Sequence, residues 1–132
     1  MTLEEIADTL PNGFHDAQIK GMSINYVKRQ VTLDLEIWVS NSLEDDSEMY
    51  RTAELKLFQF LFLVIEPPDP KYDYHDEKPL WVDGSSADPA LKSPATKFPA
   101  PLPEGAFSYS FFVNDWNAFI HVAAIDASIS LL

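Results

Sequence analysis

The stretch VTLDLEIWV, residues 31–39, decides the fold of this chain of 132 residues. Its odd-numbered positions all carry aliphatic side chains, and the positions between them carry Thr32, Asp34, Glu36 and Trp38. Successive side chains of a strand point to opposite faces of a sheet, so this strict alternation predicts a strand with one buried face and one face in water. We expect a protein built mainly from β-strands.

The segment before it, residues 16–26, also alternates, but its apolar positions change parity near Gly21. An extra residue in one strand of an antiparallel pair produces such a shift, so the pattern predicts a β-bulge there. Residues 27–30 read as a polar turn. The two segments together predict a β-hairpin.

Further strands and one helix are predicted on either side of this hairpin. Residues 2–9 should form a short helix, because Thr2 and Glu5 have the spacing of a capping box. Residues 50–65 predict a long strand whose second half is covered on both faces. Residues 107–112 and 119–132 predict a second hairpin around a turn at residues 114–117.

Residues 66–106 stand apart because nine of the ten prolines lie in them. Proline cannot donate to a strand ladder, so we expect a long acidic connection, with a short edge strand at residues 80–82. The fold prediction is therefore a single domain, residues 1–132. Its class is mainly β, either a single twisted antiparallel sheet or a small sandwich or open barrel. The short N-terminal helix and the long proline-rich loop complete it.

The chain carries 21 acidic and 9 basic residues, a formal net charge of -12. Such a charge repels nucleic acid and anionic membranes and favours a basic protein as partner. Cysteine is absent, and the first ten residues lack the basic and then apolar pattern of a signal peptide. We therefore expect a cytoplasmic protein, without a cofactor, that binds neither nucleic acid nor membrane.

The acidic residues gather in two places that could meet a basic partner. The exposed face of the 31–39 strand presents Asp34, Glu36 and Trp38. A Trp among acids is a typical binding hot spot if it stays exposed, and the alternative is that the long loop folds over and covers it. The connection after this strand adds further acids. The predicted binding residues are Asp34, Glu36, Trp38, Glu44, Asp45, Asp46 and Glu48.

An alternative site would use the histidines. A neighbouring His and Asp can pair for acid–base chemistry, as His15 and Asp16 would, and His121 would join them if the two hairpins lay side by side. Asp115 and Trp116 lie in the turn of the second hairpin and complete this alternative pocket. No metal-ligand or catalytic motif is present in the sequence, so we predict neither a metal site nor catalytic residues.

Two further stretches carry a resemblance. LPNGFHDAQI at residues 10–19, followed by the VTLDLEIWV strand, resembles the opening of a bacterial family of small uncharacterised proteins, and FVNDWNAFIHVAA at residues 112–124 resembles a later part of it. The FHDA opening is also similar to immunity proteins of bacterial toxin systems, which are small, often acidic and act by binding. The resemblance implies no catalytic residues.

Three hypotheses of function follow. The first is a non-catalytic binding protein that antagonises a basic protein, as an immunity protein does. The second is a small-ligand or metal-binding protein, or an enzyme, with its pocket near His15, Asp16 and His121. The third is a homodimer in which the exposed edge of residues 120–132 pairs with a second copy.

Overall fold

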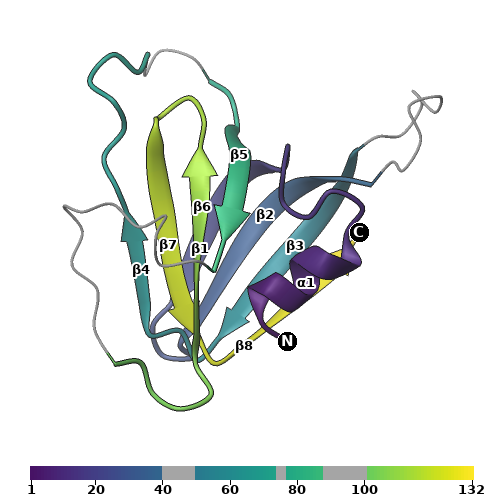
Figure 1. The fold of residues 1–132 in the computed structure, drawn as a ribbon, viewed down its shortest axis with the longest axis vertical. Helices are drawn as coiled ribbons and strands as arrows, with labels where there is room; N and C mark the ends of the chain where they lie inside the picture. The colour runs from purple at the N-terminus through teal and green to yellow at the C-terminus, as the bar shows by residue number, and fades with distance from the viewer. Residues whose placement is uncertain (40–49, 74–76, 88–100) are drawn as a thin grey trace.

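A computed structural model describes residues 1–39, 50–73, 77–87 and 101–132 of the chain. These residues form one short helix and eight strands (Figure 1). In chain order they are α1 (Leu3–Thr9), β1 (Gln18–Asn25), β2 (Gln30–Trp38), β3 (Tyr50–Phe58), β4 (Phe62–Ile65), β5 (Leu80–Ser86), β6 (Phe107–Val113), β7 (Ala118–Ala124) and β8 (Asp126–Leu131). The prediction of a mainly β protein with a short N-terminal helix is confirmed.

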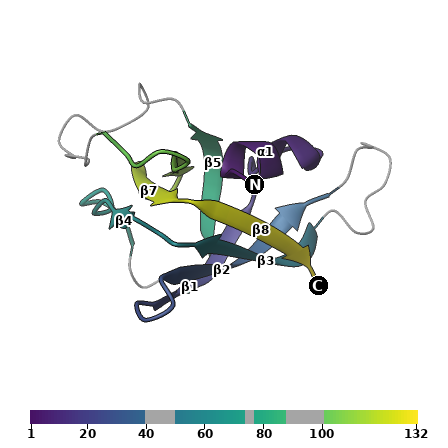
Figure 2. The same ribbon diagram turned by 90° about the horizontal axis from the view of Figure 1, so that it is seen from below.

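All eight strands belong to one antiparallel sheet with the order β4-β7-β6-β5-β1-β2-β3-β8. β3 pairs with β8, and β4 pairs with β7, so β3–β4 and β7–β8 form one long ribbon with a bend. At the bend the Leu61 amide donates to the Ala123 carbonyl at 2.7 Å, and the Ile125 amide donates to the Phe58 carbonyl at 3.2 Å. The bend lets the sheet curl into two leaves that face each other (Figures 1 and 2).

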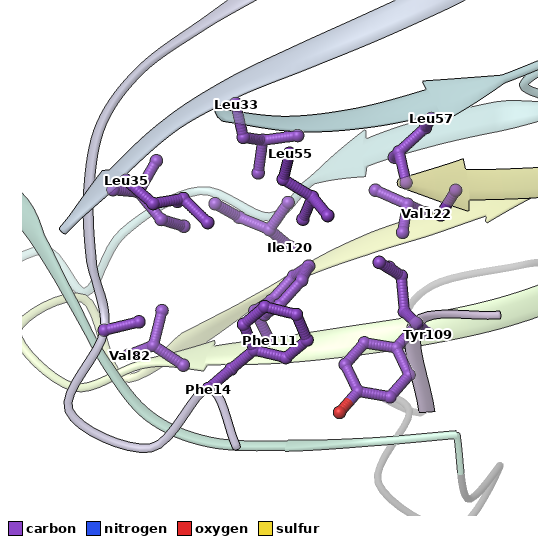
Figure 3. Packing of buried hydrophobic residues seen from close by; sticks show 14 of the residues in the cluster. Phe14, Leu33, Leu35, Leu55, Leu57, Val82, Tyr109, Phe111, Ile120 and Val122 are labelled. Atoms are coloured by element: carbon purple, nitrogen blue, oxygen red, sulfur yellow. The ribbon is translucent and has the colours of Figure 1, made fainter. Parts of the chain in front are cut away.

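The core fills the space between the two leaves (Figure 3). The alternation in β2 is confirmed, since Val31, Leu33, Leu35 and Ile37 are at most 2% exposed. Leu33 of β2 and Leu55 of β3 point toward Ile120 of β7 and Phe111 of β6 on the other leaf. Fully burying one such side chain contributes roughly 1.5–3 kcal/mol, so this layer is the main source of stability.

The helix α1 begins with the predicted capping box. The Thr2 hydroxyl accepts from the Glu5 amide at 3.1 Å, and the Glu5 carboxylate accepts from the Thr2 amide at 3.2 Å. Leu3 and Ile6 are fully buried in the same cluster as the sheet residues. Within the described residues, no helix is long and apolar enough to span a membrane.

Both predicted hairpins are present. β1 pairs with β2, and its register shifts between Ile19 and Gly21, as expected for the bulge. β6 pairs with β7 around the turn at residues 114–117. Strand β5 lies between the two hairpins in the sheet order, so it joins them.

Two predictions about strands are wrong. Residues 50–65 are not one strand, because Gln59 has φ of 51° and the chain bends before β4. Nor are the residues of β4 covered on both faces, since they are only half-buried and Ile65 is 49% exposed. The apolar run of residues 57–65 has no regular periodicity, so the sequence did not indicate this bend.

The proline-rich connection is also more regular than predicted. Its strand β5 contains no proline and runs through residues 80–86 rather than 80–82. It is not an edge strand either, because it pairs with β1 on one side and with β6 on the other. The region therefore supplies an internal part of the sheet.

Candidate functional site

A hollow of about 440 Å³ opens between α1, the turn that follows the helix and the end of β5. Glu4 and Asp8 line it from the helix side. Its other polar lining residues are Asn12, His15, Ser85, Ser86 and Tyr109. Among the described residues that line it there is no lysine or arginine. We call this feature the acidic hollow.

The turn after α1 builds one wall of the acidic hollow. Gly13 has φ of 53°, a conformation that glycine adopts at little cost. The next residue, Phe14, is 1% exposed and packs edge-on against Tyr109 at 6.0 Å and Phe111 at 5.4 Å between ring centroids. This anchored ring fixes the turn, so His15 stands at the rim with its side chain half exposed.

Negative charge dominates the interior of the hollow. Glu4 and Asp8 are one helical turn apart and therefore share a side of α1. No ion pair between described residues involves either of them. The Tyr109 hydroxyl hydrogen-bonds Ser85 at 2.8 Å. Burial raises the pKa of Tyr109, and the charges of Glu4 and Asp8 raise this pKa further.

The predicted candidates His15 and Asp16 meet at this rim. The His15 Nε2 atom lies 3.7 Å from the Asp16 Oδ2 atom, and His15 Nδ1 donates to the Asp83 carbonyl of β5. Asp16, with φ of 66°, also accepts a hydrogen bond at 3.1 Å from the Trp81 indole. Strand β5 thus holds both side chains in place.

His121 lies elsewhere, in a row of three polar side chains, of which Ser110 and His121 are buried and Glu66 is partly exposed. Its Nδ1 atom is 2.6 Å from the Ser110 hydroxyl, and its Nε2 atom is 3.2 Å from a Glu66 carboxylate oxygen. An ionised carboxylate only accepts, so the proton of neutral His121 sits on Nε2, and Ser110 donates to Nδ1. The other Glu66 oxygen accepts from the Phe119 amide at 2.8 Å.

This Ser–His–Glu row has the order of a nucleophile, a base and an orienting acid. Ser110 and His121 are, however, only 3% and 1% exposed, and Ser110 lies within a regular strand. A nucleophile must reach its substrate, which burial prevents in this conformation. The row instead satisfies two buried polar side chains with a mostly covered carboxylate, and it ties the chain after β4 to β6 and β7.

The exposed face of β2 is less acidic than its sequence implies. Glu36 accepts a hydrogen bond from Lys20 at 2.8 Å, which lowers the pKa of this carboxyl. Trp38 is half-buried and packs edge-on against Tyr50 at 5.4 Å. Asp34 remains exposed. The other predicted binding residues, Glu44, Asp45, Asp46 and Glu48, lie outside the described residues.

The alternative pocket is not assembled as one site. Strands β6 and β5 separate β7, which carries His121, from β1, which follows His15 and Asp16. Asp115 pairs with Lys78 at 3.6 Å, and Trp116 packs edge-on against Tyr72 at 6.1 Å. Across the described parts of the chain, no three His, Asp or Glu side chains converge as a metal site would require.

Sequence reasoning missed Glu4, Asp8, Ser110 and Glu66. The two helix acids are typical of the solvated side of any short surface helix, so only the hollow beside them makes them notable. Glu66 and Ser110 are 55 and 11 residues from His121, and no motif links them. Comparisons with known proteins found no matching family model, no matching curated protein and no matching solved structure.

Proposed function

We propose that this chain is a non-catalytic binding protein that captures a basic partner protein at its acidic hollow. The observation that carries the proposal is the position of Glu4 and Asp8 beside a concave site whose described lining contains no lysine or arginine. A lysine or arginine of a partner would enter the hollow and meet two carboxylates. His15 and Tyr109 would offer further polar contacts.

The charge of the whole chain supports the same partner class. A net charge of -12 speeds the approach of a cationic protein and repels anionic competitors. The acids on the β2 face and those at residues 44–48 would then act mainly on the encounter. An immunity-like role as antagonist of a basic toxin fits this arrangement and stays part of the proposal.

A second candidate function is the binding of a small cationic ligand at the same place. The volume of about 440 Å³ falls within the range of small-molecule sites. The His15 ring at the rim would offer such a ligand a further polar contact. The partner protein is the leading proposal because further acids adjoin the hollow: His15 at its rim contacts the Asp16 carboxylate and the backbone carbonyl of Asp83.

The test is affinity capture from the source cells with the wild type and three variants. The hollow variant carries Glu4→Gln and Asp8→Asn. A matched control, Asp34→Asn with Glu54→Gln, removes the same charge from the exposed strand face. The third variant neutralises the four acids of residues 44–48.

We expect the wild type and the strand-face control to capture the same basic protein, and the hollow variant to lose it. Titration calorimetry on the purified partner should then show at least about tenfold weaker binding for the hollow variant, since close charge pairs at interfaces couple by about 1.5 kcal/mol or more. A partner without basic character, or equal binding by the hollow variant, would contradict the proposal. Loss of partner capture by the strand-face variant or by the 44–48 variant would instead place the binding site at the substituted residues.

A further inference from the structure

The turn between β1 and β2 exposes apolar side chains at an unusual density. Val27 is 96% exposed and Tyr26 is 75% exposed, and Ile24 just before them is 39% exposed. Scattered exposed apolar residues need no explanation, but a contiguous group marks a contact surface. We call residues 24–29 the hairpin tip.

A second hollow, of about 500 Å³, lies against this tip. Its apolar lining comes from Val27 and from the bend of the long ribbon, where Leu61 and Ile125 lie, together with Pro103. Lys28 and Arg29 line the same hollow. The site therefore offers a concave apolar floor with two cations at its side, and it contains no residue of the acidic hollow.

The tip is held in place rather than loose. The Arg29 guanidinium donates to the Phe60 carbonyl at 2.9 Å, and the Phe60 amide donates to the Arg29 carbonyl at 3.1 Å. The ring of Tyr26 packs against that of Phe60 at 6.1 Å, and the Lys28 amide donates to the Asn25 side chain at 3.0 Å. A surface fixed in advance loses little conformational entropy when a partner binds.

The charge of the tip is opposite to that of the rest of the molecule. Lys20, Lys56 and Lys78 each pair with a carboxylate. Lys28 and Arg29 are adjacent in sequence, and neither enters an ion pair among the described residues. On a chain of net charge -12, two adjacent cations that pair with no described carboxylate form a distinct basic spot.

We infer that the hairpin tip is a second docking surface, which binds an acidic segment of a partner protein that also carries an apolar side chain. The apolar side chain would enter the hollow lined by Val27, Leu61 and Ile125. Its acidic neighbours would pair with Lys28 and Arg29. Aromatic residues and arginine are the types most enriched at interface hot spots, and the tip has both.

An anionic membrane is the competing occupant, and the structure favours the protein. Each basic residue contributes about 1 kcal/mol at an anionic bilayer, and two of them must act against the repulsion of a strongly acidic molecule. A hollow also accommodates a single side chain of a protein better than it accommodates the flat surface of a bilayer. The inference does not rest on the acidic hollow, because the two sites share no residue and bind opposite charges.

The test uses a library of short random peptides displayed on phage. Peptides that bind the Lys28→Glu, Arg29→Glu variant are first removed, and the remaining peptides are then selected for binding to the immobilised wild type. Enriched peptides should have aspartate or glutamate beside leucine, phenylalanine or tryptophan. An enriched peptide, synthesised and measured by fluorescence anisotropy, should bind the Lys28→Glu, Arg29→Glu variant and the Val27→Asp variant at least about tenfold more weakly. The matched control Arg51→Glu with Lys71→Glu makes the same charge change elsewhere and should bind as the wild type does.

Selection of no wild-type-specific peptide, or of peptides without an acidic excess, would overturn the inference. Equal loss of binding in the Arg51, Lys71 control would overturn it as well, since a general charge effect would then explain the result. Sedimentation with vesicles of phosphatidylcholine and phosphatidylserine in equal parts tests the membrane. Binding to these vesicles that depends on Lys28 and Arg29 would assign the tip to a lipid surface instead.

Discussion

Replacement of His121 by leucine should destabilise the protein strongly, although histidine and leucine are similar in volume. His121 is 1% exposed, and its ring nitrogens contact Ser110 at 2.6 Å and Glu66 at 3.2 Å. His121→Leu removes both contacts. The Ser110 hydroxyl then lies buried without this acceptor, and the Glu66 carboxylate keeps the Phe119 amide but loses its imidazole.

The cost can be worked out from these two losses. A hydrogen bond to a charged group contributes about 1.5–3 kcal/mol, and a buried hydroxyl left without a partner costs about 1–3 kcal/mol. The added apolar surface of leucine offsets part of this, so we expect a net loss of about 3 kcal/mol in the free energy of unfolding. With a urea m-value of about 1.5 kcal/mol/M, the midpoint of denaturation falls by about 2 M.

The assay is equilibrium unfolding in urea, followed by tryptophan fluorescence and by circular dichroism. Ser110→Ala should lose about 1 kcal/mol, because only one hydrogen bond is removed. Ser128→Ala on the exposed face of β8 is the control and should change the free energy by less than about 0.5 kcal/mol. A His121→Leu midpoint within error of the wild type would refute the reasoning that the Ser–His–Glu row stabilises the sheet.

Two other predictions concern the core and the exposed face. Leu55→Ala removes a fully buried side chain between the two leaves and should cost about 2–5 kcal/mol in the same urea assay. Lys20→Met should raise the pKa of Glu36 in an NMR titration, since Lys20 is the main cause of its lowered value. Because the pKa of Glu36 is lowered in the folded protein, its ionised form stabilises the fold at pH values above its unfolded-state pKa. This stabilisation is lost as the pH falls through the folded-state pKa. Acid should therefore destabilise the variant less than the wild type. A wild-type pKa of Glu36 in the variant would contradict this.

Local patterns predicted the regular parts of this fold well. Strict alternation identified β2, the parity change at Gly21 identified the bulge, and the spacing of Thr2 and Glu5 identified the helix start. Each of these signals involves residues close in sequence. The bend at Gln59 was missed because the apolar run around it has no period. The length of strand β5 was predicted too short, because the prolines on both sides of it indicated an irregular connection.

The candidate sites depend on contacts between distant segments, which a single sequence does not reveal. Glu36 looked like a free acid until the β1–β2 pairing brought Lys20 beside it. Glu4 and Asp8 looked like ordinary helix-surface acids until the turn at residues 11–16 and β5 formed a hollow next to them. The prediction that acidic residues meet a basic partner remains, with a new location proposed for it.

Binding of a basic protein at the acidic hollow can be tested directly by an NMR titration of the isotope-labelled protein with the basic partner that the wild type captures. The largest shift changes should occur at Glu4, Asp8, His15 and Ser85, around the acidic hollow, and they should vanish in the Glu4→Gln, Asp8→Asn variant. Shift changes centred on Asp34 and Trp38, with the acidic hollow unaffected, would contradict this prediction.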